Sequence, residues 1–447
     1  MKNISIIGLG FIGLPLACVL SNIKKNNKLL FQVNAYDKKY NGKNKENFFD
    51  IKKKIIDKKL LDRIENAKKN NLINFSNDYS RLKNSNVVAV SVNFHFETSQ
   101  YKNQFKKIKS LFAKISQNIN PNTLIFMETT LPPGTCDNII IPEIKRVFKK
   151  RKINAKNLLF AYSYERVMPG KNYYDSIVNI NRCYSANNKT AFKKCYEFLK
   201  QFINVKRYKP YKFSKIIDCE ASKILENSYR AVNIAMIDEW TNYSIKSKIN
   251  LNNIIDAIKI RKTHNNLMSP GLGVGGYCLT KDPNFVEVSS KYFFNNDSNF
   301  PITSKASTIN KKMPRTSMRF LNDKIKNFKN ETILIMGVAY KGDIGDLRSS
   351  PTLDLIKFLK KKNSTVTIQD PFVDEKILDC KTVKTIPNFK SFSKIIFCTS
   401  HEIYKKIKFK KFSKKPHYID LNRVLSFAQI KLLKNKKYKL DILGTNE

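Results

Sequence analysis

A cysteine in a glycine-rich stretch is the first residue of this sequence that could perform covalent chemistry. The stretch 270–283, PGLGVGGYCLTKDP, places glycines shortly before Cys278 and the carboxylate of Asp282 shortly after it. Glycines leave backbone N–H groups accessible, and a thiol in such a setting can act as a nucleophile. A single cysteine can equally be a small buried hydrophobic residue, which we expect of the other seven. For Cys278 the residues alone leave both interpretations open.

Lys223 and Asn227 could act together because they are spaced to share one face of a helix. They lie in the stretch 214–248, which contains neither glycine nor proline and predicts one long helix suited to joining domains. An ammonium and an amide on one face can project toward the same reacting atom, but such a pair is more often a solvated surface. The same applies to Glu165, in a charged loop, and to Thr130, in the proline turn TTLPPGT.

Glycines near the N-terminus indicate phosphate binding. The β-branched run Ile4–Ile7 leads into Gly8, Gly10 and Gly13, and an apolar helix start at 14–20 follows. In a strand–turn–helix unit, the first glycine makes the turn, the second lets the backbone approach a pyrophosphate, and the third allows close helix packing. This order predicts a dinucleotide site rather than a merely structural turn.

Asp37 supports the same interpretation because it ends the next predicted strand, Val33–Tyr36. An acidic residue at this position accepts hydrogen bonds from the adenosine ribose. A carboxylate there favours NAD over NADP, although Lys38 and Lys39 follow it and weaken that preference. We therefore predict NAD as the cofactor.

The elements that must position these residues form two α/β units. In the first part of the chain, short apolar runs alternate with Lys-rich helical stretches, which indicates a parallel sheet covered by helices. A second unit begins at the predicted strand Thr332–Met336, with an N-cap at Ser350 followed by Pro351. We predict an α/β protein with two Rossmann-like doubly wound domains joined by a helical central domain that contains the long helix. The predicted domains are 1–205, 206–310 and 311–447.

Composition restricts the function classes. The 447 residues include 83 Lys and Arg against 36 Asp and Glu, a formal net charge of +47. The lysines occur in small groups along the whole chain, and asparagines crowd the same stretches, so we interpret the charge as a composition bias and expect no specific nucleic-acid binding. Eight cysteines and four histidines show no metal-ligand spacing, which predicts no metal site and reduced thiols in the cytoplasm. No apolar stretch is long enough to predict a membrane span.

In combination, these stretches resemble the UDP-glucose/GDP-mannose dehydrogenase family, the nucleotide-sugar 6-dehydrogenases. The resemblance covers most of the chain and rests on segments in the family's order: GLGFIGLPLA, ETTLPPGT, YERVMPG, ASKILENSYRAVNIA, PGLGVGGYCLTKDP and GVAYKGDIGDLRSSP. It implies an NAD-binding first domain, a helical centre that forms a homodimer or larger assembly, and a last domain that binds the nucleotide of a UDP-sugar. It also implies oxidation of the C6 alcohol through the aldehyde to the uronate, with two NAD reduced per sugar and no metal, in polysaccharide biosynthesis.

The resemblance also implies roles for individual residues. Cys278 would trap the aldehyde and form a thioester, and Lys223 would stabilise the oxyanion. Glu165 would assist hydrolysis of the thioester. Asp282 and Asn227 would organise water and protons.

Further residues follow from the same match. Thr130 would hold water near the nicotinamide, while Lys341 and Arg348 would contact substrate and cofactor from the last domain. The expected cofactor-binding residues are Gly8, Gly10, Phe11, Ile12, Gly13, Asp37, Thr130 and Arg348, and the expected substrate-binding residues are Lys223, Asn227, Asn266, Gly275 and Lys341.

Several positions depart from the family's commonest pattern. Tyr277 stands where a histidine often precedes the nucleophile, and Tyr164 replaces a proline. His264 lies where relatives often have an arginine that reaches the neighbouring subunit's substrate. Thr280-Lys281 replaces a more apolar pair, and Val92-Asn93-Phe94 lacks a usual Thr-Pro. These changes bear on sugar recognition and subunit contacts more than on the chemistry.

The sequence leaves open which sugar is the substrate and allows alternative classes of function. The segment ERVMPG is more similar to the branch acting on UDP-N-acetylhexosamines than to the UDP-glucose branch, but UDP-GlcNAc, UDP-ManNAc, UDP-glucose and GDP-mannose all stay open. One alternative is a non-catalytic NAD-binding or basic nucleic-acid-binding protein on the same fold. Another is a single-step 3-hydroxyacid-type dehydrogenase, which needs no thiol.

Overall fold

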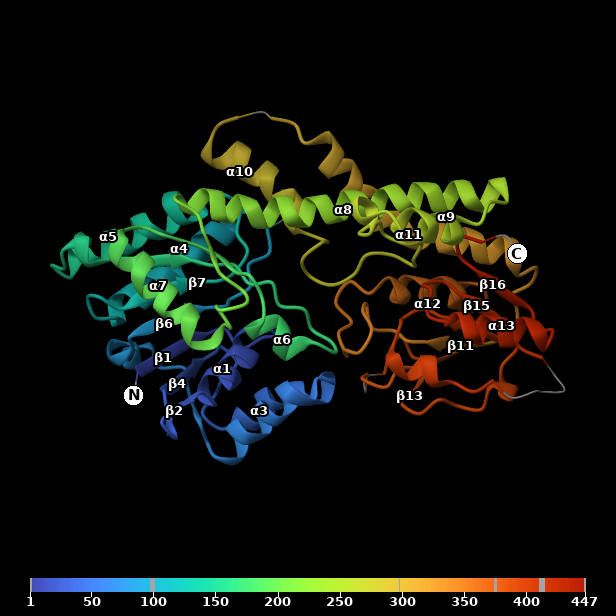
Figure 1. Cartoon of the computed structure of the whole chain (residues 1–447), viewed down its shortest axis with the longest axis horizontal. Coiled ribbons are helices and arrows are strands. Elements are labelled where there is room, and N and C mark those ends of the chain that lie inside the picture. The colour runs from blue at the N-terminus through green and yellow to red at the C-terminus, as the bar shows by residue number, and fades with distance from the viewer. Residues whose placement is uncertain (1, 97–100, 297, 374–375, 410–414, 446–447) are drawn as a thin grey trace. The chain divides into compact units, whose positions relative to one another are not determined.

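The computed structural model describes residues 2–96, 101–296, 298–373, 376–409 and 415–445. The chain divides into two compact units, and each is described by itself (Figure 1). The first unit comprises residues 1–226 and 284–300, and the second comprises residues 227–283 and 301–447.

The first unit is built on an eight-stranded sheet with the order β10-β9-β8-β7-β6-β1-β4-β5. Its strands are parallel except for the antiparallel pair β8 and β9. The chain builds outward from β1 through β4 to β5 and then returns to β6 on the other side of β1. Ligands of doubly wound sheets bind outside the carboxyl ends of the strands at such a reversal. The strands are β1 (Lys2–Ile7), β4 (Phe31–Tyr36), β5 (Ile73–Ser76), β6 (Val87–Val90), β7 (Leu124–Met127), β8 (Leu159–Tyr162), β9 (Cys183–Ala186) and β10 (Tyr211–Lys212), with a separate hairpin of β2 (Lys24–Lys25) and β3 (Lys28–Leu29).

Helices cover both faces of this sheet, which explains why its strands β6, β7 and β8 are continuous apolar runs. Successive residues of β6 enter different cores: Val87 and Ala89 pack with residues of α1 and α7, whereas Val88 and Val90 pack with residues of α4 and α5. The helices of this unit are α1 (Gly13–Ser21), α2 (Lys45–Phe49), α3 (Lys58–Lys69), α4 (Tyr101–Asn118), α5 (Ile141–Lys150), α6 (Tyr173–Val178), α7 (Lys189–Phe202) and α10 (Phe285–Phe293).

The predicted long helix is present as α8 (Ile216–Ser247), 32 residues without a break. It begins in the first unit and ends in the second. Two further helices of the second unit are α9 (Leu251–Lys259) and α11 (Pro301–Lys324). No helix among the described residues is long and apolar enough to cross a membrane.

A six-stranded sheet forms the rest of the second unit, in the order β13-β12-β11-β14-β15-β16. All its pairings are parallel. As in the first sheet, the strand order reverses at the first strand: the chain adds β12 and β13 on one side of β11, and then β14, β15 and β16 on the other side. The fold class is thus confirmed: two parallel-sheet α/β parts and a helical central region with one long helix. The elements are β11 (Thr332–Met336), β12 (Thr365–Gln369), β13 (Lys381–Val383), β14 (Lys394–Phe397), β15 (His417–Asp420), β16 (Leu440–Ile442), α12 (Pro351–Lys361) and α13 (Phe427–Asn435).

The predicted start of α12 is confirmed, because Ser350 is the N-cap residue and Pro351 follows it in the helix. Pro351 occupies the first turn of the helix, as expected. Ser350, however, makes no side-chain cap bond; its hydroxyl donates to the Val338 carbonyl at 2.7 Å instead. The hydroxyl group thus acts as a donor to the Val338 carbonyl and not as an acceptor for the helix N–H groups.

Asp238 is a buried carboxyl group of the second unit. Its carboxyl group is buried between α8 and α11, accepting from Thr316 at 3.3 Å and from Asn242 at 3.4 Å. Burial raises its pKa to about 6, against 3.8 for an ordinary aspartate. A raised pKa means that the stabilising contribution is complete below the ordinary pKa and is lost as pH rises through the folded pKa.

We therefore expect Asp238→Asn to stabilise the protein increasingly as pH rises from about 4 to about 7, by up to about 3 kcal/mol. Unfolding by denaturant across this range measures the effect. Asp323→Asn, which removes an exposed carboxylate of α11, is the control and should show no such trend. A variant no more stable than wild type at neutral pH would contradict this account of Asp238.

Candidate active site

The glycine turn after β1 has the geometry that its sequence predicts. Gly8 has a φ of +94°, and a Cβ there would lie 2.9 Å from the Ser91 carbonyl oxygen. A Cβ on Gly13 would lie 1.9 Å from the Gly8 carbonyl oxygen, so α1 packs directly on the turn. Gly10 is different, because no described atom lies within 4 Å of a Cβ built there. The turn therefore leaves open space at the glycine expected to face a pyrophosphate.

Asp37 lies beside this turn, at the end of β4. Its carboxylate accepts hydrogen bonds from the Leu9 N–H at 2.9 Å and from the Lys39 N–H at 2.9 Å. Phe11 and Ile12 are half-buried, and the Tyr173 hydroxyl donates to the Phe11 carbonyl, tying α6 to the turn. The turn, its open space and the adjacent carboxylate fit NAD.

Gly10→Ala is expected to weaken NAD binding at least about tenfold without lowering the melting temperature, because the methyl group meets no protein atom but enters the space left for the pyrophosphate. Calorimetric titration with NAD measures the affinity. Gly13→Ala is the contrasting variant, since its methyl group clashes with the turn and should destabilise the fold. Unchanged NAD affinity in Gly10→Ala would contradict the assignment of this turn.

Lys223 and Glu165 meet in the first unit. The Lys223 ammonium is buried and donates to the Glu165 backbone carbonyl at 3.0 Å, with the Tyr164 ring centroid 5.4 Å away. Burial raises the pKa of the Glu165 carboxyl, although the Lys223 charge and the Val167 N–H oppose this. A carboxyl with a raised pKa, beside an ammonium, can exchange protons closer to neutral pH.

Tyr164, which stands where the family commonly has proline, is itself a partner in this part of the first unit. Its hydroxyl accepts from Ser222 at 3.1 Å and from Arg166 at 3.1 Å. Arg166 also binds Glu226 at 2.8 Å. The aromatic replacement thus links the loop that carries Glu165 to helix α8.

A buried ion pair near the ends of β7 and β8 was missed by the sequence reasoning. Arg182 binds Glu128 at 2.9 Å with both side chains almost fully buried, and Ser91 donates to the same carboxylate. Arg182 also donates to the Ser163 carbonyl. Thr130 follows Glu128 by two residues and is buried. This ion pair therefore holds Glu128 at the start of the segment that carries Thr130.

The Cys278 loop lies in the second unit and packs closely on Tyr340. Cβ atoms on Gly275 and Gly276 would lie 2.5 Å and 2.6 Å from Tyr340 side-chain atoms, so larger residues do not fit there. Cys278 is exposed, whereas the other seven cysteines are buried, as expected. The Cys278 carbonyl accepts from the Asp282 N–H at 2.8 Å, which closes the turn after the thiol.

Asp282 is fully buried and is held from two sides. Asn227 of α8 donates to one carboxylate oxygen at 2.8 Å, and the Lys281 ammonium binds the other at 2.8 Å. The structure thus brings together Asn227, Asp282 and the turn that carries Cys278. Lys281, a departure from the family's commonest pattern, is the charge partner of this carboxylate.

Arg348 lies near Tyr277 of this loop, and Lys341 and Arg230 lie near each other in the same unit. Arg348 forms a two-bond pair with Asp346, at 2.6 Å and 3.0 Å, and its guanidinium lies 5.1 Å from the Tyr277 ring centroid. Partial desolvation, together with the Arg230 charge, lowers the pKa of Lys341. Arg230 is a further cation that the sequence reasoning missed, although its place one turn after Asn227 on α8 could have indicated it.

Asn266 and His264 lie on an exposed segment of the second unit. Asn266 donates to the Tyr229 hydroxyl at 2.7 Å, and His264 contacts the Thr263 hydroxyl at 2.8 Å. Neither contact reaches a predicted catalytic residue.

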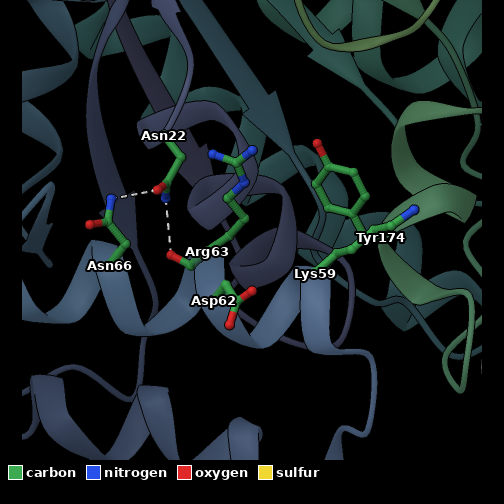
Figure 2. Close-up of a pocket in the computed structure, with 6 residues that line it drawn as sticks. All are labelled: Asn22, Lys59, Asp62, Arg63, Asn66 and Tyr174. Atoms are coloured by element: carbon green, nitrogen blue, oxygen red, sulfur yellow. Dashed lines mark hydrogen bonds between the residues drawn. The ribbon is translucent and has the colours of Figure 1, made fainter.

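A separate cavity of about 290 Å³ lies on the first unit (Figure 2). Figure 2 shows Asn22 bonded to Asn66 and to the Arg63 carbonyl at its edge. Its lining contains no predicted site residue; it consists of Asn22, Lys59, Asp62, Arg63, Asn66 and Tyr174. Among the described residues, no group of three or more His, Cys, Asp or Glu side chains is arranged to hold a metal ion.

Comparison with known proteins assigns three consecutive parts of the chain to one family. Models of the UDP-glucose/GDP-mannose dehydrogenase family match residues 2–202 as the NAD binding domain, 218–312 as the central domain and 334–427 as the UDP binding domain. A UDP-N-acetyl-D-mannosamine dehydrogenase of Methanococcus vannielii is 28% identical over 461 aligned residues, covering 99% of this chain and 97% of that protein.

Solved structures share the fold. The structure of a UDP-D-ManNAc dehydrogenase from Pyrococcus horikoshii has a TM-score of 0.77 at 22% identity, covering 99% of both chains. A UDP-glucose dehydrogenase from Pyrobaculum islandicum has a TM-score of 0.74 at 15% identity, covering 100% of this chain and 98% of that one. Because relatives named for different sugars superpose almost equally well, the fold does not distinguish the sugar.

Proposed function

The chain belongs to the UDP-glucose/GDP-mannose dehydrogenase family, and we propose that it oxidises the C6 alcohol of UDP-N-acetylmannosamine to the carboxylate. It is an NAD-binding nucleotide-sugar dehydrogenase. The choice of sugar is supported by the full-length relative from Methanococcus vannielii and by the ERVMPG segment. The buried Asn227–Asp282–Lys281 cluster beside the exposed Cys278 turn is the observation that carries the catalytic assignment.

NAD supplies the hydride acceptor when bound. We propose that the alcohol loses one hydride and one proton to give the aldehyde, and that the Cys278 sulfur then adds to the aldehyde carbon. Loss of a second hydride from this thiohemiacetal gives a thioester, and water releases the carboxylate and the thiol. The two oxidation steps together reduce two NAD per sugar, and we propose that the uronate is used in polysaccharide biosynthesis.

The proposed role of each side chain follows from its contacts. Lys223, fixed by the Glu165 carbonyl, stabilises the oxyanion as negative charge develops on the C6 oxygen. Asp282 and Asn227 hold the turn after Cys278 and organise protons there. Glu165, with its raised pKa, assists the water that cleaves the thioester.

The sugar is tested by measuring kcat/KM for UDP-ManNAc, UDP-GlcNAc, UDP-GalNAc, UDP-glucose and GDP-mannose. We expect UDP-ManNAc to exceed the others by at least about tenfold, since even one extra or missing methylene group in a binding pocket changes kcat/KM by about 10- to 200-fold. A higher value for UDP-glucose would overturn the choice of sugar and leave the family assignment intact.

We also propose that the protein is a homodimer that pairs through α8. Tyr229, Met236, Trp240 and Tyr243 recur at helical spacing on α8, and all four are exposed within the second unit. Trp240 and Tyr243 pack edge to face with ring centroids 5.8 Å apart. A stripe of large apolar side chains along a helix fits a second copy of the same helix.

Trp240→Glu is accordingly expected to weaken dimerisation by about 2 kcal/mol or more, about thirtyfold, since a buried tryptophan is typically a dominant interface contact. Sedimentation over a concentration series measures the dissociation constant. Lys246→Ala, on the last turn of α8, serves as the control. A wild-type protein that sediments as a monomer at all concentrations would contradict the dimer.

A further inference from the structure

Glu220 is a fully buried carboxyl group of the first unit that has no role in the mechanism above. It lies on α8, three residues before Lys223. Its two oxygens accept hydrogen bonds from the Gly134 N–H at 2.6 Å and from the Cys136 N–H at 2.9 Å. These contacts join α8 to the loop 131–136, which directly follows Thr130.

Two hydrogen bonds to Glu220 join the loop to α8. The two prolines of the loop carry no N–H, and the Thr135 N–H donates to a carbonyl within the loop. Glu220 accepts hydrogen bonds from the N–H groups of Gly134 and Cys136. A buried N–H group without an acceptor costs free energy. Loss of the Glu220 acceptor would therefore favour a rearranged loop. On its other side the loop is held by Ser289 of α10, whose hydroxyl donates to a proline carbonyl at 2.6 Å.

Resting on the function proposed above, we propose that Glu220 is a positioning residue for the reaction. It fixes Thr130 relative to Lys223 by holding the loop after Thr130 against the turn of α8 that carries Lys223. Lys223 is fixed in the same unit by its bond to the Glu165 carbonyl at 3.0 Å. Both groups are therefore placed by one short stretch of α8.

The charge of Glu220 decides how firmly the loop is held. The ionised carboxylate accepts both N–H bonds, whereas the protonated group has an O–H in place of one acceptor. Burial raises the pKa of Glu220 to about 8. The titratable groups facing it are Cys136, Asp137, Cys219 and Tyr162. Burial raises the pKa of Cys136, of Cys219 and of Tyr162, so these three stay neutral while Glu220 titrates.

The test compares Glu220→Gln with Asp218→Asn, which removes an exposed carboxylate from the same helix. Gln keeps the shape but turns one acceptor oxygen into an NH₂ group. At a pH of about 9, where Glu220 is mostly ionised, we expect kcat per NAD-binding site to fall about 10- to 100-fold in Glu220→Gln, the cost of a displacement near 1 Å, with KM values within about threefold. Asp218→Asn should match wild type. The ratio of wild-type to Glu220→Gln kcat should rise as pH passes through about 8, because Gln resembles the protonated acid.

Several outcomes would overturn the role. A Glu220→Gln protein with normal kcat, with a loss confined to KM, or with a ratio independent of pH would each do so, and a purely structural role would lower the melting temperature without these changes. If Glu220→Gln folds poorly, Ser289→Ala loosens the same loop and should lower kcat by a smaller factor; no change would then overturn the role. A wild type inactive on every nucleotide sugar would remove the proposed function and this role together, whereas an active wild type with an unaffected variant would remove the role alone.

Discussion

Cys278→Ser is expected to abolish uronate formation, by at least about 10³-fold, while NAD binds as in wild type. A serine hydroxyl at this exposed turn is a weaker nucleophile than a thiol and gives no thioester. The glycine turn that we expect to bind NAD belongs to the other unit, so the substitution should leave it unchanged. Uronate is measured by mass spectrometry of the products, and NAD affinity by calorimetric titration.

Cys380→Ser is the matched control, because it makes the same change at a buried cysteine of the same unit and should leave uronate formation intact. Full turnover in Cys278→Ser would sink the thioester mechanism and favour a single-step dehydrogenase without a thiol. A variant that accumulates aldehyde would support the two-step order.

Lys223→Ala is expected to lower kcat by about 10² to 10³ with little change in KM, the usual cost of removing one oxyanion donor. The ammonium is buried and donates to the Glu165 carbonyl, so its position is fixed before the reaction begins. Steady-state kinetics with saturating NAD separates the two parameters.

Lys215→Ala removes an exposed ammonium just before the same helix and should behave like wild type. Lys223→Arg keeps the charge and should recover part of the lost rate. A raised KM with a normal kcat in Lys223→Ala would instead show that Lys223 contributes to substrate binding only.

Local patterns explain what the sequence could predict. Gly8, Gly10 and Gly13 succeed each other within one strand–turn–helix unit, so their geometry follows from neighbouring residues. The place of Asn227, one turn after Lys223 on the uninterrupted helix α8, likewise follows from the residues around it. Seven cysteines were expected to be buried because a single cysteine is usually a small hydrophobic core residue, and they are.

Contacts between distant segments explain what the sequence could not predict. The Glu128–Arg182 pair joins residues 54 positions apart, and Glu220 reaches the Gly134 and Cys136 N–H groups 86 and 84 positions away. A buried carboxylate looks like any helix-surface glutamate until its partners are known. Lys281 likewise was noted only as a departure from a pattern, although it is the charge partner of Asp282.

The most direct test of the central claim is the ratio of NADH formed to sugar consumed by the purified protein with UDP-ManNAc. The double oxidation predicts two NADH per sugar, with the carboxylate as the product. One NADH per sugar, with an aldehyde or ketone as the product, would contradict it.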